Sequence, residues 1–171
     1  MKEIQGNLFD HIGKADAICI TTNGFVKSNG ECVMGKGCAQ EATKRWPGIA
    51  LLLGDSIKAD GNAVIPLISE QETIILSFPV KPIRETFDGT NAVRHMASKF
   101  KVGDSMPGWA CKAKIDIIES SASCLARIAT AHKWTNIILP RPGCGAGELN
   151  WAEVKEVLNK HLDDRFSSIT F

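Results

Sequence analysis

Two glycine-rich loops contain the residues whose types and spacing are best suited to chemistry. They are Met34–Gly37 and Gly143–Gly147. Each loop follows an apolar run and precedes a helical pattern, so its backbone N–H groups and the helix dipole together favour an anion. Neither has the spacing of a Walker A loop or a dinucleotide-binding fingerprint. Two such loops at one sheet edge favour a diphosphate, whereas the competing interpretation is that the glycines only form tight turns.

A lysine after an apolar run is the strongest candidate for a reactive group. Phe78-Pro79-Val80-Lys81 is followed by Pro82, and the two prolines restrict the backbone on either side of the lysine. If the amine is desolvated, its pKa falls and it can attack an electrophilic carbon or stabilise charge on a leaving oxygen. The alternative is an ordinary solvated lysine at the end of a strand.

Several polar residues near the two loops each have a functional and a structural interpretation. Glu148 can act as an acid or base or orient Lys81, but a carboxylate there also offsets a helix dipole. Lys36 can neutralise phosphate or be solvated. Asn23 can bond a ribose hydroxyl, or it can form a turn with Gly24.

Three other residue types receive mainly structural interpretations. Cys144 is expected to pack within the second loop. His95 is expected on a helical face as a core or surface residue rather than a ligand. Trp109 can cover a ligand, but surface packing is the simpler interpretation, and Trp151 is expected to pack under the second loop.

The composition limits the class of protein. The chain has 171 residues, a formal net charge of +1 and six cysteines. This length predicts a single domain over residues 1–171. The balanced charge excludes a protein that wraps duplex DNA, but it allows a small local contact with nucleic acid. Because there is no CxxC pair, no zinc-ligand spacing and no long apolar segment, we expect free thiols, no metal or other cofactor, no membrane contact and a cytoplasmic location.

The order of apolar runs and helical patterns predicts an α/β fold. Strands are expected at Lys2–Gln5, Ala15–Thr22, Asn62–Ile68, Thr73–Phe78, Asn136–Leu139 and Ser168–Phe171. Helices are expected at Gly37–Trp46, Pro47–Ala59, Thr90–Phe100, Ala113–His132 and Trp151–Leu162. The last helix has Asn150 as its N-cap and Glu153 three residues on, a variant of the capping box. Val102–Trp109 is expected to be a loop.

The loops and their strands resemble the macro domain family, which binds ADP-ribose. The resemblance rests on four separated points and spans almost the whole chain: Gly6-Asn7-Leu8, the apolar strand ending in Asn23, Val33–Gly37, and Leu139–Trp151. Within the family, the chain is most similar to the branch of DNA ADP-ribosyl hydrolases and terminal glutamate-ADP-ribose hydrolases. The stretch Phe78–Lys81 matches that branch.

This resemblance implies a three-layer α/β/α sandwich over a mixed central sheet and a role for each part of the site. Asn7 and Leu8 would lie against adenine, and Gly143, Cys144, Gly145, Ala146 and Gly147 would wrap the diphosphate. Asn23 would lie near the distal ribose with the first loop, that is, with Val33, Met34, Gly35, Lys36 and Gly37. Lys81, which matches the catalytic lysine of the branch, would lie beside the anomeric carbon C1″.

The chain departs from the family pattern at three positions. Asn7 stands where the family usually has Asp, so any bond from the adenine amino group would go to an uncharged oxygen. Ile20 replaces a common Asn. Gly147 occupies the position of an acidic partner for the lysine, and Glu148 is the nearest carboxylate.

The leading functional expectation is an enzyme that hydrolyses the glycosidic bond between ADP-ribose and DNA or protein, with Lys81 and Glu148 as catalytic residues. Its partner is then ADP-ribose or an ADP-ribosylated macromolecule, and we expect a monomer. The alternatives are a non-catalytic ADP-ribose reader, an ADP-ribose 1″-phosphate phosphatase, and a purely structural domain. The missing acidic residue in the second loop favours the reader.

Overall fold

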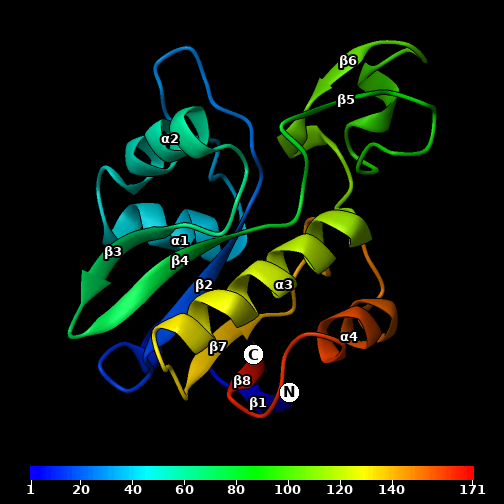
Figure 1. Ribbon diagram of the computed structural model, residues 1–171. Helices are drawn as coiled ribbons and strands as arrows, with labels where there is room; N and C mark the ends of the chain where they lie inside the picture. The colour runs from blue at the N-terminus through cyan, green and yellow to red at the C-terminus, as the bar shows by residue number, and fades with distance from the viewer.

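The computed structural model describes all 171 residues, and its centre is a six-stranded sheet (Figure 1). The strand order is β1-β8-β7-β2-β4-β3. The strands are β1 (Lys2–Gln5), β2 (Ala17–Thr22), β3 (Pro66–Glu70), β4 (Thr73–Pro79), β7 (Ile137–Pro140) and β8 (Phe166–Thr170). Neighbouring strands are parallel except β3, which pairs antiparallel with β4. The sheet is therefore mixed, as predicted.

The third strand begins later than its apolar pattern predicts. The expected strand Asn62–Ile68 is β3 at Pro66–Glu70. Before Pro66 the chain still runs along β4, but the Ser77 hydroxyl interrupts the ladder by accepting from Ile65 N at 3.0 Å and donating to Ala63 O at 3.0 Å. Pro66, the first residue of β3, has no N–H to donate, and the pairing register shifts between Pro66 and Ile68.

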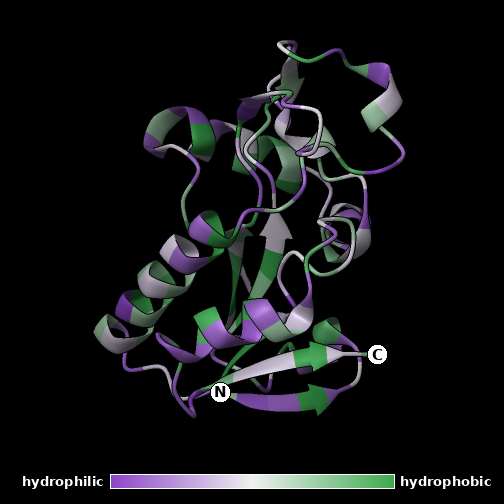
Figure 2. Ribbon diagram, turned by 90° about the vertical axis from the view of Figure 1, so that its right-hand side faces the viewer, coloured by the Kyte–Doolittle hydropathy of each residue, from purple (hydrophilic) through white to green (hydrophobic).

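Helices cover both faces of the sheet. On one face lie α1 (Gly37–Arg45), α2 (Ile49–Asp60) and the short 3-10 helix η1 (Leu8–His11), which share a buried core with Ile18, Ile20 and Ile75. On the other lie α3 (Ile115–Ala131) and α4 (Trp151–Asn159), packed on a core that includes Phe78 and Phe166. The helices carry both hydrophobic and hydrophilic residues (Figure 2). Helices on both faces of the sheet make the predicted three-layer sandwich.

The ends of the helices follow local chemistry. The Asn150 side chain accepts from Ala152 N at 2.8 Å and caps α4, as predicted. Glu153 makes no return bond to Asn150, so only half of the expected capping box forms. In α2, Gly54 is required because a Cβ there would lie 1.8 Å from the carbonyl oxygen of Gly30. The long connection after β2 can therefore pack directly on this helix.

The segment between β4 and α3 differs from the sequence prediction. The expected helix Thr90–Phe100 is a series of turns with only a 3-10 helix, η2, at Ala97–Lys99. The Asp88 carboxylate accepts from the N–H groups of Thr90 and Asn91, which favours a turn over a helix. The expected loop Val102–Trp109 contains β6 (Ser105–Pro107), paired with β5 (Arg84–Thr86), and the start of η3 (Gly108–Ala110).

Residues 83–112 thus form a small extension with a core of its own. Phe87, Met106 and Cys111 are buried in it, and Val93, Met96 and Ala110 form a second small cluster. Figure 1 shows the β5–β6 ribbon standing apart from the main sheet, beyond the end of β4.

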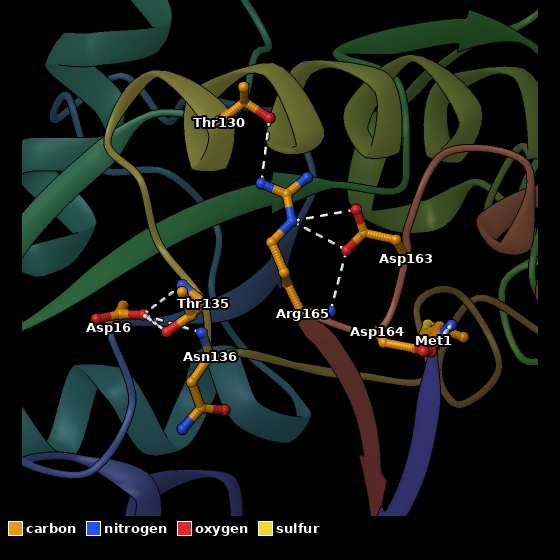
Figure 3. Close-up of polar contacts among 8 residues, drawn as sticks. All are labelled: Met1, Asp16, Thr130, Thr135, Asn136, Asp163, Asp164 and Arg165. Carbon is orange, nitrogen blue, oxygen red and sulfur yellow. Dashed lines mark hydrogen bonds and ion pairs between the residues drawn. The ribbon is translucent and has the colours of Figure 1, made fainter.

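Polar contacts connect neighbouring segments at the end of the sheet where the parallel strands begin (Figure 3). The Asp16 carboxylate accepts from Thr135 N at 2.7 Å and from Asn136 N at 2.9 Å, which joins the start of β2 to the start of β7. Arg165 donates to Asp163 and Thr130, and the N-terminal ammonium lies 3.7 Å from Asp164.

No helix has the length and apolar character that a membrane crossing requires, and all six cysteines are free.

Candidate functional site

The carboxyl ends of the five parallel strands open into one cleft of about 1060 Å³. Across this edge lie Asn7 after β1, Phe171 after β8, the second loop after β7, the first loop after β2 and Lys81 after β4. With neighbouring strands about 4.8 Å apart, the four steps from β1 to β4 span roughly 19 Å. The cleft is therefore elongated, and its parts occur in a set order along the sheet edge.

The second loop presents unpaired backbone donors to the middle of the cleft. Glu148 N donates to Gly145 O and Leu149 N to Gly143 O, both at 3.0 Å, which folds the loop into a compact turn. The N–H groups of Gly145, Ala146 and Gly147 donate to no other protein group. Such a group of N–H donors is an anion-binding concavity.

Gly147 is needed to form this turn. A Cβ at Gly147 would lie 2.5 Å from both the Ala113 Cβ and the carbonyl oxygen of Gly143. Gly143 itself has φ +76°. Gly145, by contrast, has nothing within 4 Å of a built Cβ and borders open space. The absence of an acidic residue at position 147 therefore has a packing reason.

The first loop leads into the N-terminus of α1, which also faces the cleft. The N–H groups of Gly37, Cys38 and Ala39 donate to no protein group, and no side chain caps the helix. These are the orphan donors of a helix N-terminus, where an anion is stabilised by the dipole. The two loops thus present free donors to the same cleft, as predicted.

Asn23 braces the first loop. Its Oδ1 accepts from Phe25 N at 2.9 Å and its Nδ2 donates to Val33 O at 2.8 Å. The turn-forming interpretation is therefore confirmed. One amide hydrogen remains free for a ligand, and the predicted contact with a ribose hydroxyl stays a prediction. Met34 is buried in the core beneath the loop, whereas Gly35, Lys36 and Gly37 are exposed on the cleft.

Lys81 is held at the far end of the cleft by two carbonyl groups. The residue is 7% exposed, and its Nζ donates to Ala146 O at 3.0 Å and to Trp109 O at 3.2 Å. Ala146 belongs to the second loop, so the amine directly contacts the predicted anion site. The backbone is fixed as well, because Asn62 donates to Lys81 O at 2.9 Å.

Burial lowers the pKa of the Lys81 amine to about 8. Desolvation is the main cause, and the nearby Lys36 charge lowers the pKa further, while Cys111 and Glu148 oppose it. A neutral amine has two hydrogens and one lone pair. With both hydrogens directed to carbonyl oxygens, the lone pair is left for an electrophile.

Glu148 is placed beside the cleft rather than in its lining. Its carboxylate accepts from Arg94 N at 3.0 and 3.2 Å, and Arg94 Nε lies 3.6 Å away. The carboxylate thus holds the turn Val93–Met96 of the extension against the second loop. It still lies close enough to Lys81 to raise the pKa of that amine.

The remaining predicted residues lie at the other end of the cleft or within the second loop. The Asn7 oxygen accepts from Phe9 N at 2.9 Å and caps η1, so it is already engaged, while the Asn7 amide nitrogen makes no bond to the protein. The Leu8 side chain is buried. Burial raises the pKa of the Cys144 thiol to about 11, which agrees with its interpretation as a packing residue.

Two residues that line this cleft were predicted in other roles: His95 on a helical face, and Trp151 packed under the second loop. His95 lies on an exposed turn, not on a helix, with its Nε2 at 3.5 Å from the Nζ of Lys36. The ring of Trp151 lies under the Arg141 guanidinium, and its Nε1 donates to Glu3 on β1. No sequence pattern signals these contacts, because they join segments that are far apart along the chain.

Comparison with known proteins gives a consistent result at the level of the fold. No protein-family model matches the chain, and no curated protein matches it. Among solved structures, the macrodomain of Mycobacterium tuberculosis DarG superposes with a TM-score of 0.69 at 19% identity, covering 98% of this chain and 95% of that one. The macrodomain of Thermus aquaticus DarG gives 0.68 at 19% identity, covering 99% and 97%.

A third similar structure is Thermosipho africanus DarTG in complex with ADP-ribose. Its TM-score is 0.66 at 18% identity, and the match covers 96% of this chain but 39% of that chain. These matches show that the protein has the macrodomain fold, which the four sequence motifs predicted.

Proposed function

We propose that this chain, a macrodomain by its fold, binds ADP-ribose in the cleft and hydrolyses the bond between ADP-ribose and a macromolecule. The observation that carries this proposal is the buried Lys81 amine, whose hydrogens are held by Ala146 O and Trp109 O. An amine with a pKa of about 8 is partly neutral near physiological pH and can act as a nucleophile.

The order of groups along the cleft supports ADP-ribose as the ligand. The diphosphate fits the middle, where N–H donors from the second loop and from α1 are free. Leu8, Phe9 and Phe171 make the β1–β8 end apolar, which suits the base. The distal ribose then reaches Lys81. The solved complex of a protein with this fold and ADP-ribose supports the same assignment.

The chemistry follows from the position of Lys81. Its lone pair attacks C1″ of the distal ribose while the bond to the macromolecule breaks, and water then releases ADP-ribose. The charge of Lys36 helps to lower the pKa of Lys81 and so increases the fraction of the amine that is neutral. Glu148 contributes by holding the Val93–Met96 turn beside this end of the cleft.

The charge of the extension favours DNA over protein as the conjugated macromolecule. Residues 83–112 contain five Lys or Arg and three Asp or Glu, a net charge of +2 in a chain whose net charge is +1. The cations are Arg84, Arg94, Lys99, Lys101 and Lys112. A cationic surface beside Lys81 attracts phosphate groups that flank an ADP-ribosylated base.

The test compares ADP-ribosylated DNA and ADP-ribosylated protein as substrates for the wild type and for Lys81→Met. The wild type releases ADP-ribose, with a rate constant that rises with pH and levels off above about 8 as the amine becomes neutral. Lys81→Met binds ADP-ribose but turns over neither substrate. Lys160→Met, which replaces an exposed lysine outside both the cleft and the extension, serves as the control. If Lys81→Met keeps wild-type turnover, the proposed mechanism is wrong; if the wild type binds without turnover, the protein is a reader.

We also propose a cytoplasmic monomer. Six free thiols are typical of a reducing compartment, which supports the cytoplasmic location. Light scattering of the purified protein, with and without ADP-ribose, gives the mass that checks the monomer.

A further inference from the structure

Few groups in the cleft can exchange a proton near neutral pH. The titratable side chains that line it are Lys36, Cys38, Glu41, Lys44, Lys81, His95, Arg141 and Cys144. Burial raises the pKa of Cys38 and of Cys144, so both remain neutral thiols. His95 is the only imidazole among them and Glu41 the only carboxylate side chain. Histidine is the side-chain type best suited to proton transfer in this range.

His95 lies on a turn that is fixed on both sides. Val93 and Met96, which flank its turn, are buried against Ala110, and Val93 N donates to Ala110 O at 2.9 Å. On the other side, Arg94 N is held by the Glu148 carboxylate. The buried residues on the turn hold its backbone, while His95 itself is exposed on the cleft.

This turn places the imidazole at the same end of the cleft as Lys81. The anchor Ala110 is adjacent to Trp109, whose carbonyl oxygen accepts from Lys81 Nζ. His95 Nε2 lies 3.5 Å from Lys36 Nζ, and the charge of Lys36 acts on the pKa of Lys81. If the Lys36 ammonium donates to Nε2, the other ring nitrogen, Nδ1, is the one that carries hydrogen.

We propose that His95 is the general acid that delivers a proton to the group leaving C1″. This inference rests on the proposed function of Lys81. A glycosidic bond to a nitrogen or to a hydroxyl oxygen breaks slowly unless the departing atom is protonated. Neither Lys81, as the nucleophile, nor Glu148, whose oxygens hold Arg94 N, supplies that proton.

The steps balance in protons and electrons. In the first step the neutral Lys81 Nζ forms a bond to C1″, the electron pair of the breaking bond moves to the leaving atom, and that atom takes the Nδ1 proton of His95 while the Lys36 ammonium passes a proton to Nε2. In the second step water attacks C1″ and gives a proton to His95 Nδ1, the Nε2 proton returns to Lys36, and Lys81 leaves as a neutral amine. ADP-ribose and the unmodified macromolecule are the products.

The experiment uses two substrates that differ in their need for a proton. One is the macromolecular conjugate that the wild type hydrolyses, and the other is the 4-nitrophenyl glycoside of ADP-ribose, whose phenolate departs without protonation. His95→Gln is expected to lose about 100-fold in kcat on the first substrate, in the range typical of general acids. On the second it is expected to lose less than about 3-fold, and its Kd for ADP-ribose stays near that of the wild type.

His132→Gln is the matched control, because His132 is exposed and stacks on Trp134 far from the cleft. If His95→Gln loses the same factor in kcat on both substrates, His95 has a structural role and the inference is overturned. The inference is also overturned if Glu41→Gln, and not His95→Gln, loses kcat on the macromolecular conjugate alone. A wild-type protein that hydrolyses neither substrate overturns the proposed function as well. The two failures are therefore distinguishable.

Discussion

Replacing Lys81 by Met is expected to change the pH dependence of folding as well as activity. Burial lowers the pKa of this amine from an ordinary value of 10.5 to about 8. Below pH 8 the Lys81 amine is charged in both the folded and the unfolded protein, so the folded protein has the full free-energy cost of desolvating the charge. Between pH 8 and 10.5 the folded state holds it neutral while the unfolded state protonates it, so the cost declines as pH rises.

The size of the effect follows from linkage. The desolvation cost is about 3 kcal/mol at pH 7 and about 1 kcal/mol at pH 10. Lys81→Met lacks this cost at every pH, although it also loses the bonds to Ala146 O and Trp109 O. The loss of those bonds is the same at every pH. The difference in unfolding free energy, variant minus wild type, therefore falls by about 2 kcal/mol between pH 7 and pH 10.

Urea denaturation of both proteins at pH 7, 8, 9 and 10 measures this difference. Other titrating groups are shared by the two proteins and cancel. Lys99→Met, in which an exposed lysine is replaced, should show no such trend. A change smaller than about 1 kcal/mol for Lys81→Met would mean that the amine is solvated in the folded protein, and the argument for a neutral nucleophile would then fail.

Three further predictions concern stability, two of them at the cleft and one at the opposite edge of the sheet. In Gly147→Ala the new Cβ would lie 2.5 Å from Ala113 Cβ, so this variant should lose about 2 kcal/mol of stability and bind ADP-ribose more weakly. Gly145→Ala is the control, because its Cβ meets nothing, and its stability should stay within about 0.5 kcal/mol of the wild type. Equal effects of the two substitutions would contradict the tight turn. Thr22→Val removes a buried hydroxyl that has no partner, so thermal denaturation should show a gain of about 1 kcal/mol, and a loss would show that the hydroxyl is bonded. Asp16→Ala should cost about 2 kcal/mol in urea denaturation because two backbone N–H groups lose their acceptor, and an unchanged midpoint would refute this.

Most of the fold was predictable because the signals are local. The buried strand β4 and the helix α3 follow from apolar runs and three- and four-residue spacing in a short stretch of chain. The segment at residues 90–100 was not predictable in this way. Its residues suit a helix, but the Asp88 carboxylate and the contact of Val93 with Ala110 favour turns. Such tertiary contacts outweigh weak helix propensity.

The sequence by itself determined the two glycine loops, the position of Lys81 after a buried strand and, through four separated motifs, the macrodomain fold. These are properties of short segments, and each segment shows them on its own. Only the tertiary structure decided the state of Lys81, because the carbonyls of Trp109 and Ala146 and the charge of Lys36 come from distant segments. For the same reason only the folded chain brings His95 next to Lys36, 59 residues away in sequence, and brings the Glu148 carboxylate to the backbone N–H of Arg94, 54 residues away.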